Sequence, residues 1–240
     1  MSKLSFRHIL LSLAFTSGGT VGGWALTAKL AGDSAALSFF KVGVIAVILM
    51  SAAQLFFFLL GKNRLIYQLV FGIAFGCGLV WFMLCLVLPM LWVETVSAIA
   101  KLLLFFFLAM VCIANGLKAG AQFREKWRNQ GESILVRIYN PKENTVDWQQ
   151  VLAPMRLSIE LYIPRVPKST NPFISVAIIL GMLTGLSLRN VFPTFSLFAW
   201  GVPSCVVMSM FAQIFGLGVA QIKKLVELEK RFGKPIKPSM

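Results

Sequence analysis

Few side chains in this sequence could carry out acid–base, nucleophilic or metal chemistry. His8 is the only histidine, and seven of the nine Asp and Glu residues lie in two polar segments, 118–171 and 223–240, that we expect to be cytoplasmic. Glu143 and Asp147 share a short stretch, NPKENTVDW, that is typical of a polar turn leading into a helix. The sequence contains no HExxH, GxSxG or glycine-rich phosphate-binding motif. We therefore expect that the protein is not an enzyme.

The four cysteines also lack the surroundings of a metal-binding or disulfide site. Cys77, Cys85, Cys112 and Cys205 lie inside apolar runs, with no CxxC pair and no neighbouring His or carboxylate. Metal sites need clustered ligands, whereas an isolated cysteine in an apolar run usually packs as a small hydrophobe. We expect no metal and no cofactor.

Composition indicates a protein that crosses a membrane several times. Of 240 residues, 58% are hydrophobic and only 13% are charged, whereas soluble domains average roughly 25% charged residues. The mean hydropathy is +0.79. Since a spanning helix needs about 20 apolar residues, we predict an all-α polytopic membrane protein with about six transmembrane helices. The predicted helices cover residues 8–30, 37–60, 65–92, 95–117, 172–189 and 195–221.

This pattern divides the chain into four parts. Residues 1–117 contain transmembrane helices 1–4, and residues 118–171 form a polar cytoplasmic insertion. Residues 172–222 contain helices 5 and 6, and residues 223–240 form a basic amphipathic tail. Residues 1–28 also fit a signal peptide cleaved after Ala28, but we expect this segment to be a true span.

The basic residues predict the orientation of the helices. With six spans, 19 of the 23 Lys and Arg residues lie on one side of the membrane, in the N-terminus, the turn after helix 2, the insertion and the tail. Cytoplasmic segments carry such an excess, so we expect both termini in the cytoplasm and the chain in a bacterial inner membrane. Because topology accounts for the net charge of +14, anionic lipid headgroups are the expected partners of this face, and nucleic acid is not.

Pairs of glycines four residues apart predict close helix packing. In lipid, helices associate through tight backbone contact rather than the hydrophobic effect, and glycine permits that contact. The pattern fits ordinary packing within one bundle, and it also fits a surface for self-association, for which the first helix is the best candidate. The paired glycines are Gly18, Gly19, Gly22, Gly23, Gly72, Gly76, Gly181 and Gly185.

Charged residues near the predicted outer ends of the helices form a second candidate site. Ionisable groups inside a membrane often have a function, but lysines near a helix end can also extend to the interface. We interpret this outer charged cluster as an interfacial rim; the alternatives are a pore mouth and an ion-pair lock between helices 2 and 4. Its members are Lys29, Asp33, Lys41, Glu94, Lys101 and Arg189.

The insertion and the tail are the candidate cytoplasmic docking elements. We predict that helix 4 continues to a cap at Gly131, followed by strands over 133–139 and 156–163 with a short helix between them. The tail is predicted to be helical as far as Gly233, either lying on lipid or pairing with another protomer. The residues expected to dock partners are Trp127, Trp148, Leu157, Ile159, Leu161 and Ile163.

These features together predict a non-enzymatic inner-membrane scaffold or accessory subunit. It would belong to a multiprotein system of the secretion, conjugation or defence type, and would be a homo-oligomer or have membrane-protein partners. Two alternatives remain open on the sequence. One is an oligomeric channel or transporter, and the other is a membrane immunity or exclusion protein.

Overall fold

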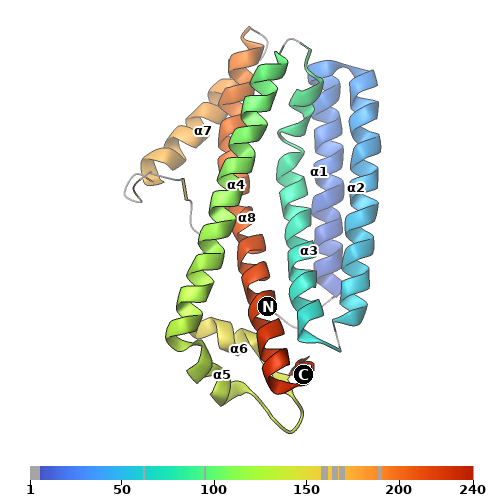
Figure 1. Cartoon of the computed structure of the whole chain (residues 1–240). Helices are drawn as coiled ribbons and strands as arrows, with labels where there is room; N and C mark the ends of the chain where they lie inside the picture. The colour runs from blue at the N-terminus through green and yellow to red at the C-terminus, as the bar shows by residue number, and fades with distance from the viewer. Residues whose placement is uncertain are drawn as a thin grey trace.

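The computed structural model is an elongated bundle of long helices with a small folded cap at one end (Figure 1). It describes residues 6–61, 63–94, 96–157, 162–163, 167, 171–188 and 191–239. The helices are α1 (Phe6–Ala31), α2 (Asp33–Leu60), α3 (Leu65–Leu84), α4 (Ala98–Lys126), α5 (Glu132–Ile138), α6 (Trp148–Leu152), α7 (Asn171–Leu188) and α8 (Pro193–Phe232). Short 3₁₀ turns cover Leu88–Trp92 and Ala153–Met155, and a π-helical turn covers Trp127–Gly131. Two short strands, β1 (Thr145–Val146) and β2 (Lys237–Pro238), pair in parallel.

Among the described residues, five helices are long and apolar enough to cross a membrane, which confirms the predicted helical membrane class. They are α1, α2, α3, the helix that begins with α4, and the greater part of α8. The sixth predicted span corresponds to α7, whose apolar stretch covers only Pro172–Gly185. Large apolar side chains are exposed along these helices, for example Leu49 on α2 (65% exposed) and Phe106 on α4 (68%). Such a surface is expected where a helix faces lipid.

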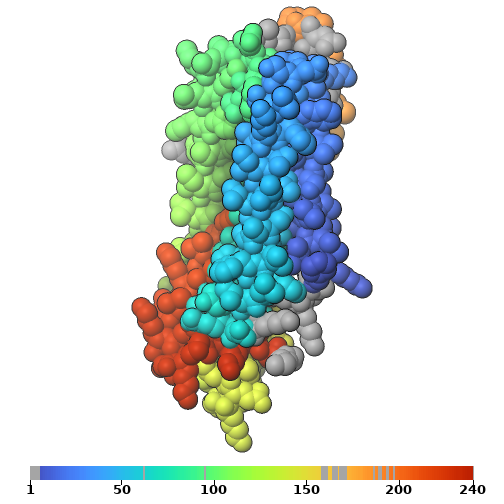
Figure 2. Space-filling model, turned by 90° about the vertical axis from the view of Figure 1, so that its right-hand side faces the viewer, coloured from blue at the N-terminus to red at the C-terminus, as the bar shows by residue number. Residues whose placement is uncertain are grey.

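The long helices form two groups. On one side α1 packs against α2 and α3, and on the other α4 and α7 pack against α8. Contacts between α3 and α8 join the two groups. Figure 2 shows α2 as a column along one face of the molecule, with the cap below it.

Both α4 and α8 run from the far end of the bundle towards the cap (Figure 1). The chain must therefore return from the cap to the far end between them. The helix α7 covers the upper part of this return (Figure 1). Below α7, the amide of Asn115 donates a hydrogen bond of 2.8 Å to the carbonyl oxygen of Tyr162, and the Lys118 ammonium lies 3.8 Å from the Tyr162 ring centroid. These contacts attach the returning segment to the side of α4.

The cap has its own hydrophobic core, built from segments far apart in the sequence. It consists of α5, α6, β1 and β2 together with the adjoining ends of α3, α4 and α8. Arg64 and Glu229 join two of these ends by an ion pair of 2.6 Å, and this contact raises the pKa of the Arg64 guanidinium. The buried core residues are Leu65, Leu69, Phe123, Trp127, Leu135, Val146, Trp148, Val151, Met155, Ala220, Leu225, Leu228 and Ile236.

Two predictions for the insertion are wrong. Gly131 does not end a helix, because its backbone is helical (φ −62°, ψ −44°) and α4 continues through the π-helical turn into α5. Residues 133–139 are therefore not a strand. Leu135 is buried, while Ile134 and Ile138 are half-buried against the cap core, and this spacing suits a helix. The predicted turn before Thr145 and the short helix after Asp147 are both confirmed.

The second predicted strand lies only partly within the described residues. Leu157, Tyr162 and Ile163 are in irregular backbone rather than in a strand. Ile159 and Leu161 lie outside the described residues. The β pairing that the structure does contain joins the insertion to the C-terminal tail instead.

The tail helix is confirmed, but both predicted roles for its apolar face are wrong. The helix α8 ends at Gly233, whose positive φ of 66° suits a glycine after a helix C-terminus. Leu225 and Leu228 are buried in the cap, and the Phe232 ring stacks on Tyr139 at a centroid distance of 4.5 Å. The insertion of the same chain therefore covers this face, so it neither lies on lipid nor awaits a second protomer.

Candidate functional site

The glycines of α1 divide into a packed pair and an open pair. A Cβ on Gly19 would lie 2.9 Å from the Cα of Phe82, and one on Gly23 would lie 3.0 Å from the carbonyl oxygen of Cys85. These two positions need glycine because α1 lies directly against the end of α3 and the turn that follows it. Gly19 and Gly23 thus have the ordinary packing role that the sequence allowed.

Gly18 and Gly22 lie on the other side of α1. Both are exposed, and a Cβ added to either would meet no atom within 4 Å. Ala14, four residues earlier, is also exposed. We call these three residues the α1 outer strip: a line of small side chains, at four-residue spacing, on the surface of the bundle.

The remaining predicted glycine pairs pack within the chain. A Cβ on Gly76 would lie 3.1 Å from Cγ2 of Ile214 on α8. A Cβ on Gly181 would lie 3.4 Å from the carbonyl oxygen of Ala199, and one on Gly185 would lie 3.3 Å from the carbonyl carbon of the same residue. This pair therefore sets the contact between α7 and α8. Gly72 lines a pocket of about 350 Å³ between α3 and α8, together with His8.

The closest contact between helices involves glycines outside the predicted pairs. The backbones of α4 and α8 meet at Gly116 and Gly216, where a Cβ on Gly216 would lie 2.8 Å from the Cα of Gly116. One turn further, a Cβ on Gly120 would lie 3.2 Å from the carbonyl oxygen of Gly216. The spacing of Gly116 and Gly120 is the same small-xxx-small signal, but the pair lies at the boundary of the predicted fourth span.

Polar side chains inside the bundle hydrogen-bond to one another. At the contact between α4 and α8, Asn115 accepts from Gln213 at 2.7 Å and donates to Ser209 at 3.2 Å. On the other side of the molecule, Gln54 donates to Ser12, and Trp81 donates to Thr20 at 3.0 Å. Such bonds between helices are typical of membrane bundles. Gln54 and Gln213 therefore form hydrogen bonds between helices.

The outer charged cluster is a set of separate surface residues. Lys29, Asp33, Lys41 and Glu94 are exposed, and no ion pair connects them within the described part of the chain. Lys101 donates a hydrogen bond of 2.9 Å to the carbonyl oxygen of Leu91. The ion-pair lock between helices 2 and 4 is therefore not formed. Arg189 lies outside the described residues.

The two tryptophans predicted to dock partners are buried in the chain's own cap. Trp127 and Trp148 are each 5% exposed, and their rings stack at a centroid distance of 5.6 Å. Trp148 also donates through Nε1 to Oε1 of Gln221 at 3.1 Å. Leu157 packs against the same core, and Ile163 is half-buried. These side chains stabilise the cap, so any docking surface must use other residues.

Groups that could catalyse a reaction or hold a metal are dispersed. Among the described residues, no three His, Cys, Asp or Glu side chains lie close enough to hold a metal ion. Cys77, Cys85, Cys112 and Cys205 are free thiols, two of them buried and two half-buried. His8 lies edge-on to Phe75, with ring centroids 6.2 Å apart.

Comparison with known proteins gives no match to any protein family, curated protein or solved structure. The fold therefore defines the chain only as a helical protein, with five helices in its described part that are long and apolar enough to cross a membrane. Its candidate sites are the α1 outer strip and the surface around the cap.

Proposed function

We propose that the chain is a non-enzymatic membrane scaffold that self-associates through the α1 outer strip. The observation that supports this most directly is the contrast between two glycine pairs on one helix. Gly19 and Gly23 are needed for packing within the chain, whereas Gly18 and Gly22 have empty space around them. Glycine in a helix interior costs about 1 kcal/mol relative to alanine, and a contact with a second helix would offset that cost.

The properties of α1 favour a protein neighbour over lipid. Its hydropathy is the lowest of the five candidate spans, and a strip of one alanine and two glycines offers lipid little apolar surface. A second copy of α1 could approach the backbone closely along Ala14, Gly18 and Gly22. The resulting dimer would be symmetric, since the same strip would face itself.

The proposed orientation places the cap and both termini in the cytoplasm. Supporting it, the path of the chain brings the start of α1 and the end of α8 towards the same end of the bundle (Figure 1). The cap end also carries most of the basic residues, as expected for cytoplasmic segments of an inner-membrane protein. In this arrangement α7 belongs to the sixth crossing, and the cap offers its exposed surface to partners of a secretion, conjugation or defence system.

Substitution of the strip tests self-association. In the double variant Gly18→Leu/Gly22→Leu, the added side chains meet open space within the protomer, so the fold should persist while the contact between copies is lost. The matched control is Ala52→Leu, which adds bulk at an exposed site on α2. The readout is the protein mass of the complex after gentle extraction, compared with 26.5 kDa for one chain.

We expect multiples of the chain mass for the native protein and the control, and a single chain for the double variant. If the complex of the double variant keeps the mass of the native complex, the α1 outer strip is not the surface through which copies associate. A native complex that contains other proteins would support the scaffold and identify its pathway. A pure homo-oligomer that conducts ions would favour the channel alternative instead.

A further inference from the structure

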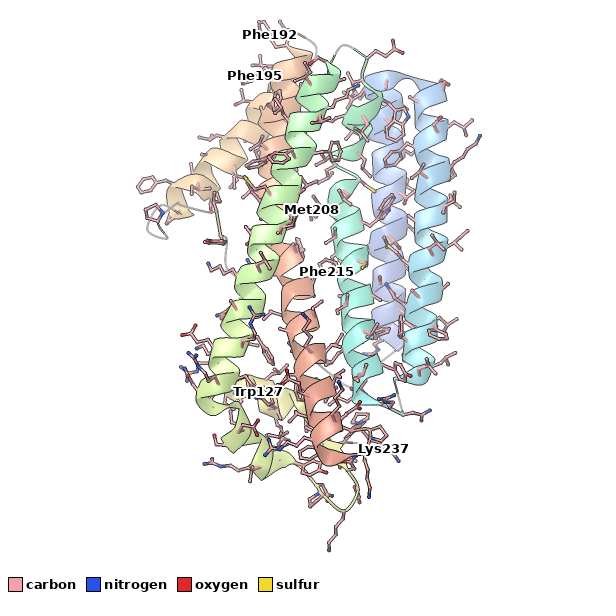
Figure 3. The ribbon with its side chains drawn as sticks, viewed as in Figure 1. Trp127, Phe192, Phe195, Met208, Phe215 and Lys237 are labelled. Carbon is pink, nitrogen blue, oxygen red and sulfur yellow. The ribbon has the colours of Figure 1, made fainter. Side chains whose placement is uncertain are left out.

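A basic pocket opens between α4 and α8 at the edge of the cap. The two helices touch at Gly116 and Gly216 and separate below that point (Figure 1). The space between them is a pocket of about 460 Å³. Phe123, Trp127 and Ala220 provide its apolar lining, and Figure 3 places Trp127 between the lower parts of α4 and α8. The charged residues around it are Arg124, Arg128, Glu132, Lys223, Lys224 and Glu227.

The positive charge of this pocket is only partly neutralised. Both glutamates are already engaged: Glu227 with Lys224 at 2.9 Å, and Glu132 with Arg231 at 3.0 Å and Lys224 at 3.9 Å. Arg124, Arg128 and Lys223 are exposed and have no acidic partner within the described part of the chain. Three cations therefore surround one opening without a counter-charge from the described residues.

The surface leading to the pocket changes from apolar to basic. Along one face of α4, the exposed residues Ile113 and Leu117 are followed by Arg124 and Arg128, at helical spacings of four and seven. On α8, the exposed Val219 is followed four residues later by Lys223. An acyl chain followed by a phosphate headgroup has the same order of apolar and anionic parts.

We infer that this pocket binds a phosphate group, with Arg124, Arg128 and Lys223 as its ligands. Arginine pairs with phosphate through two parallel hydrogen bonds, and lysine adds a compact charge. The phosphate can come from the headgroup of an anionic lipid or from a soluble phosphate ester. The inference goes beyond the proposed scaffold and does not depend on self-association. Only the lipid source depends on the proposed position in the membrane.

The test compares two variants that remove equal charge from the same end of the molecule. Arg124→Gln/Lys223→Gln removes two cations from the pocket, and Arg137→Gln/Lys142→Gln removes two exposed cations from elsewhere on the cap. The full chain in neutral detergent is titrated with two probes. Binding of short-chain phosphatidylglycerol is measured by native mass spectrometry, and binding of glycerol phosphate is measured by the shift in melting temperature. All four substituted side chains are exposed, so both variants should keep the fold.

We expect the pocket variant to weaken binding by about tenfold or more, as loss of a charge-assisted hydrogen bond implies, and the control to change it by less than about twofold. Binding of phosphatidylglycerol alone identifies a lipid site, and binding of glycerol phosphate identifies a soluble ester. Equal weakening in both variants would show a general charge effect and overturn the inference. Failure of both probes to bind the native chain would overturn it as well.

Discussion

The contact between α4 and α8 gives the sharpest prediction of stability. A Cβ on Gly216 would lie 2.6 Å from the carbonyl carbon of Gly116, which is 0.8 Å short of the 3.4 Å at which contact becomes ordinary. The obstacle is backbone, so no side chain can move aside. Gly216→Ala must therefore separate the two helices, and this separation also stretches the bonds from Asn115 to Gln213 and Ser209.

The facing glycine supplies the matched control. A Cβ on Gly116 would lie 3.6 Å from the carbonyl oxygen of Ala212, an ordinary distance. Both substitutions gain the same helix propensity, at most about 1 kcal/mol, so their difference isolates the packing cost. Forced overpacking typically costs about 1–3 kcal/mol, and we expect the upper part of that range at Gly216.

Thermal unfolding of the purified full chain in detergent measures this difference. A thiol-reactive dye reports the transition, because Cys85 and Cys205 are buried in the folded chain. At about 2–4 °C per kcal/mol for a chain of this length, Gly216→Ala should melt roughly 5–10 °C below Gly116→Ala. Equal melting temperatures for the two variants would refute the close approach of α4 and α8.

Three further predictions concern the cap. Trp148→Phe leaves Oε1 of Gln221 buried without its donor and should cost about 1–3 kcal/mol in thermal unfolding, whereas Trp24→Phe at a 43% exposed site should cost little. Gly131→Ala would bring a Cβ to 2.8 Å from Cε2 of Trp127, so the near-ultraviolet circular dichroism of the stacked tryptophans should weaken; an unchanged spectrum would contradict that geometry. Arg64→Met should cost about 1 kcal/mol, because Arg64 is still 39% exposed. Since the ion pair raises the pKa of Arg64, its contribution is lost on the alkaline side only when pH rises through that pKa, so the difference in melting temperature from the native chain should stay constant from about pH 7 to 10; a decline over that range would contradict the assignment.

Hydropathy alone was sufficient to predict the long helices. The apolar runs that become α1, α2 and α8 are far longer than any core strand, so their helical state follows from length. Hydropathy predicts the fifth span less well, because its apolar stretch is shorter than a bilayer-spanning helix needs. In the structure, α7 covers only part of the return path. Spacing also predicted the α8 C-terminus at Gly233.

The cap could not be predicted because its contacts join distant segments. Residues 133–139 are short and rich in branched side chains, and a short run fits both helical and strand periods; continuity with α4 selects the helix. The sequence predicts an amphipathic helix with Leu225 and Leu228 on its apolar face, but only the structure shows that the insertion covers this face. Likewise, the pairs Gly18–Gly22 and Gly19–Gly23 have the same four-residue spacing in the sequence. Only the position of α3 shows that the first pair is open and the second is packed.

Cross-linking through α1 in the native membrane tests self-association most directly. Gly22→Cys places a thiol in the α1 outer strip, and Leu49→Cys places one on a 65% exposed site of α2 as the control. Under mild oxidation, we expect a disulfide-linked dimer for Gly22→Cys and none for Leu49→Cys, because only the strip would bring two copies within bonding distance. Equal cross-linking of both variants, or none of Gly22→Cys, would contradict self-association through the α1 outer strip.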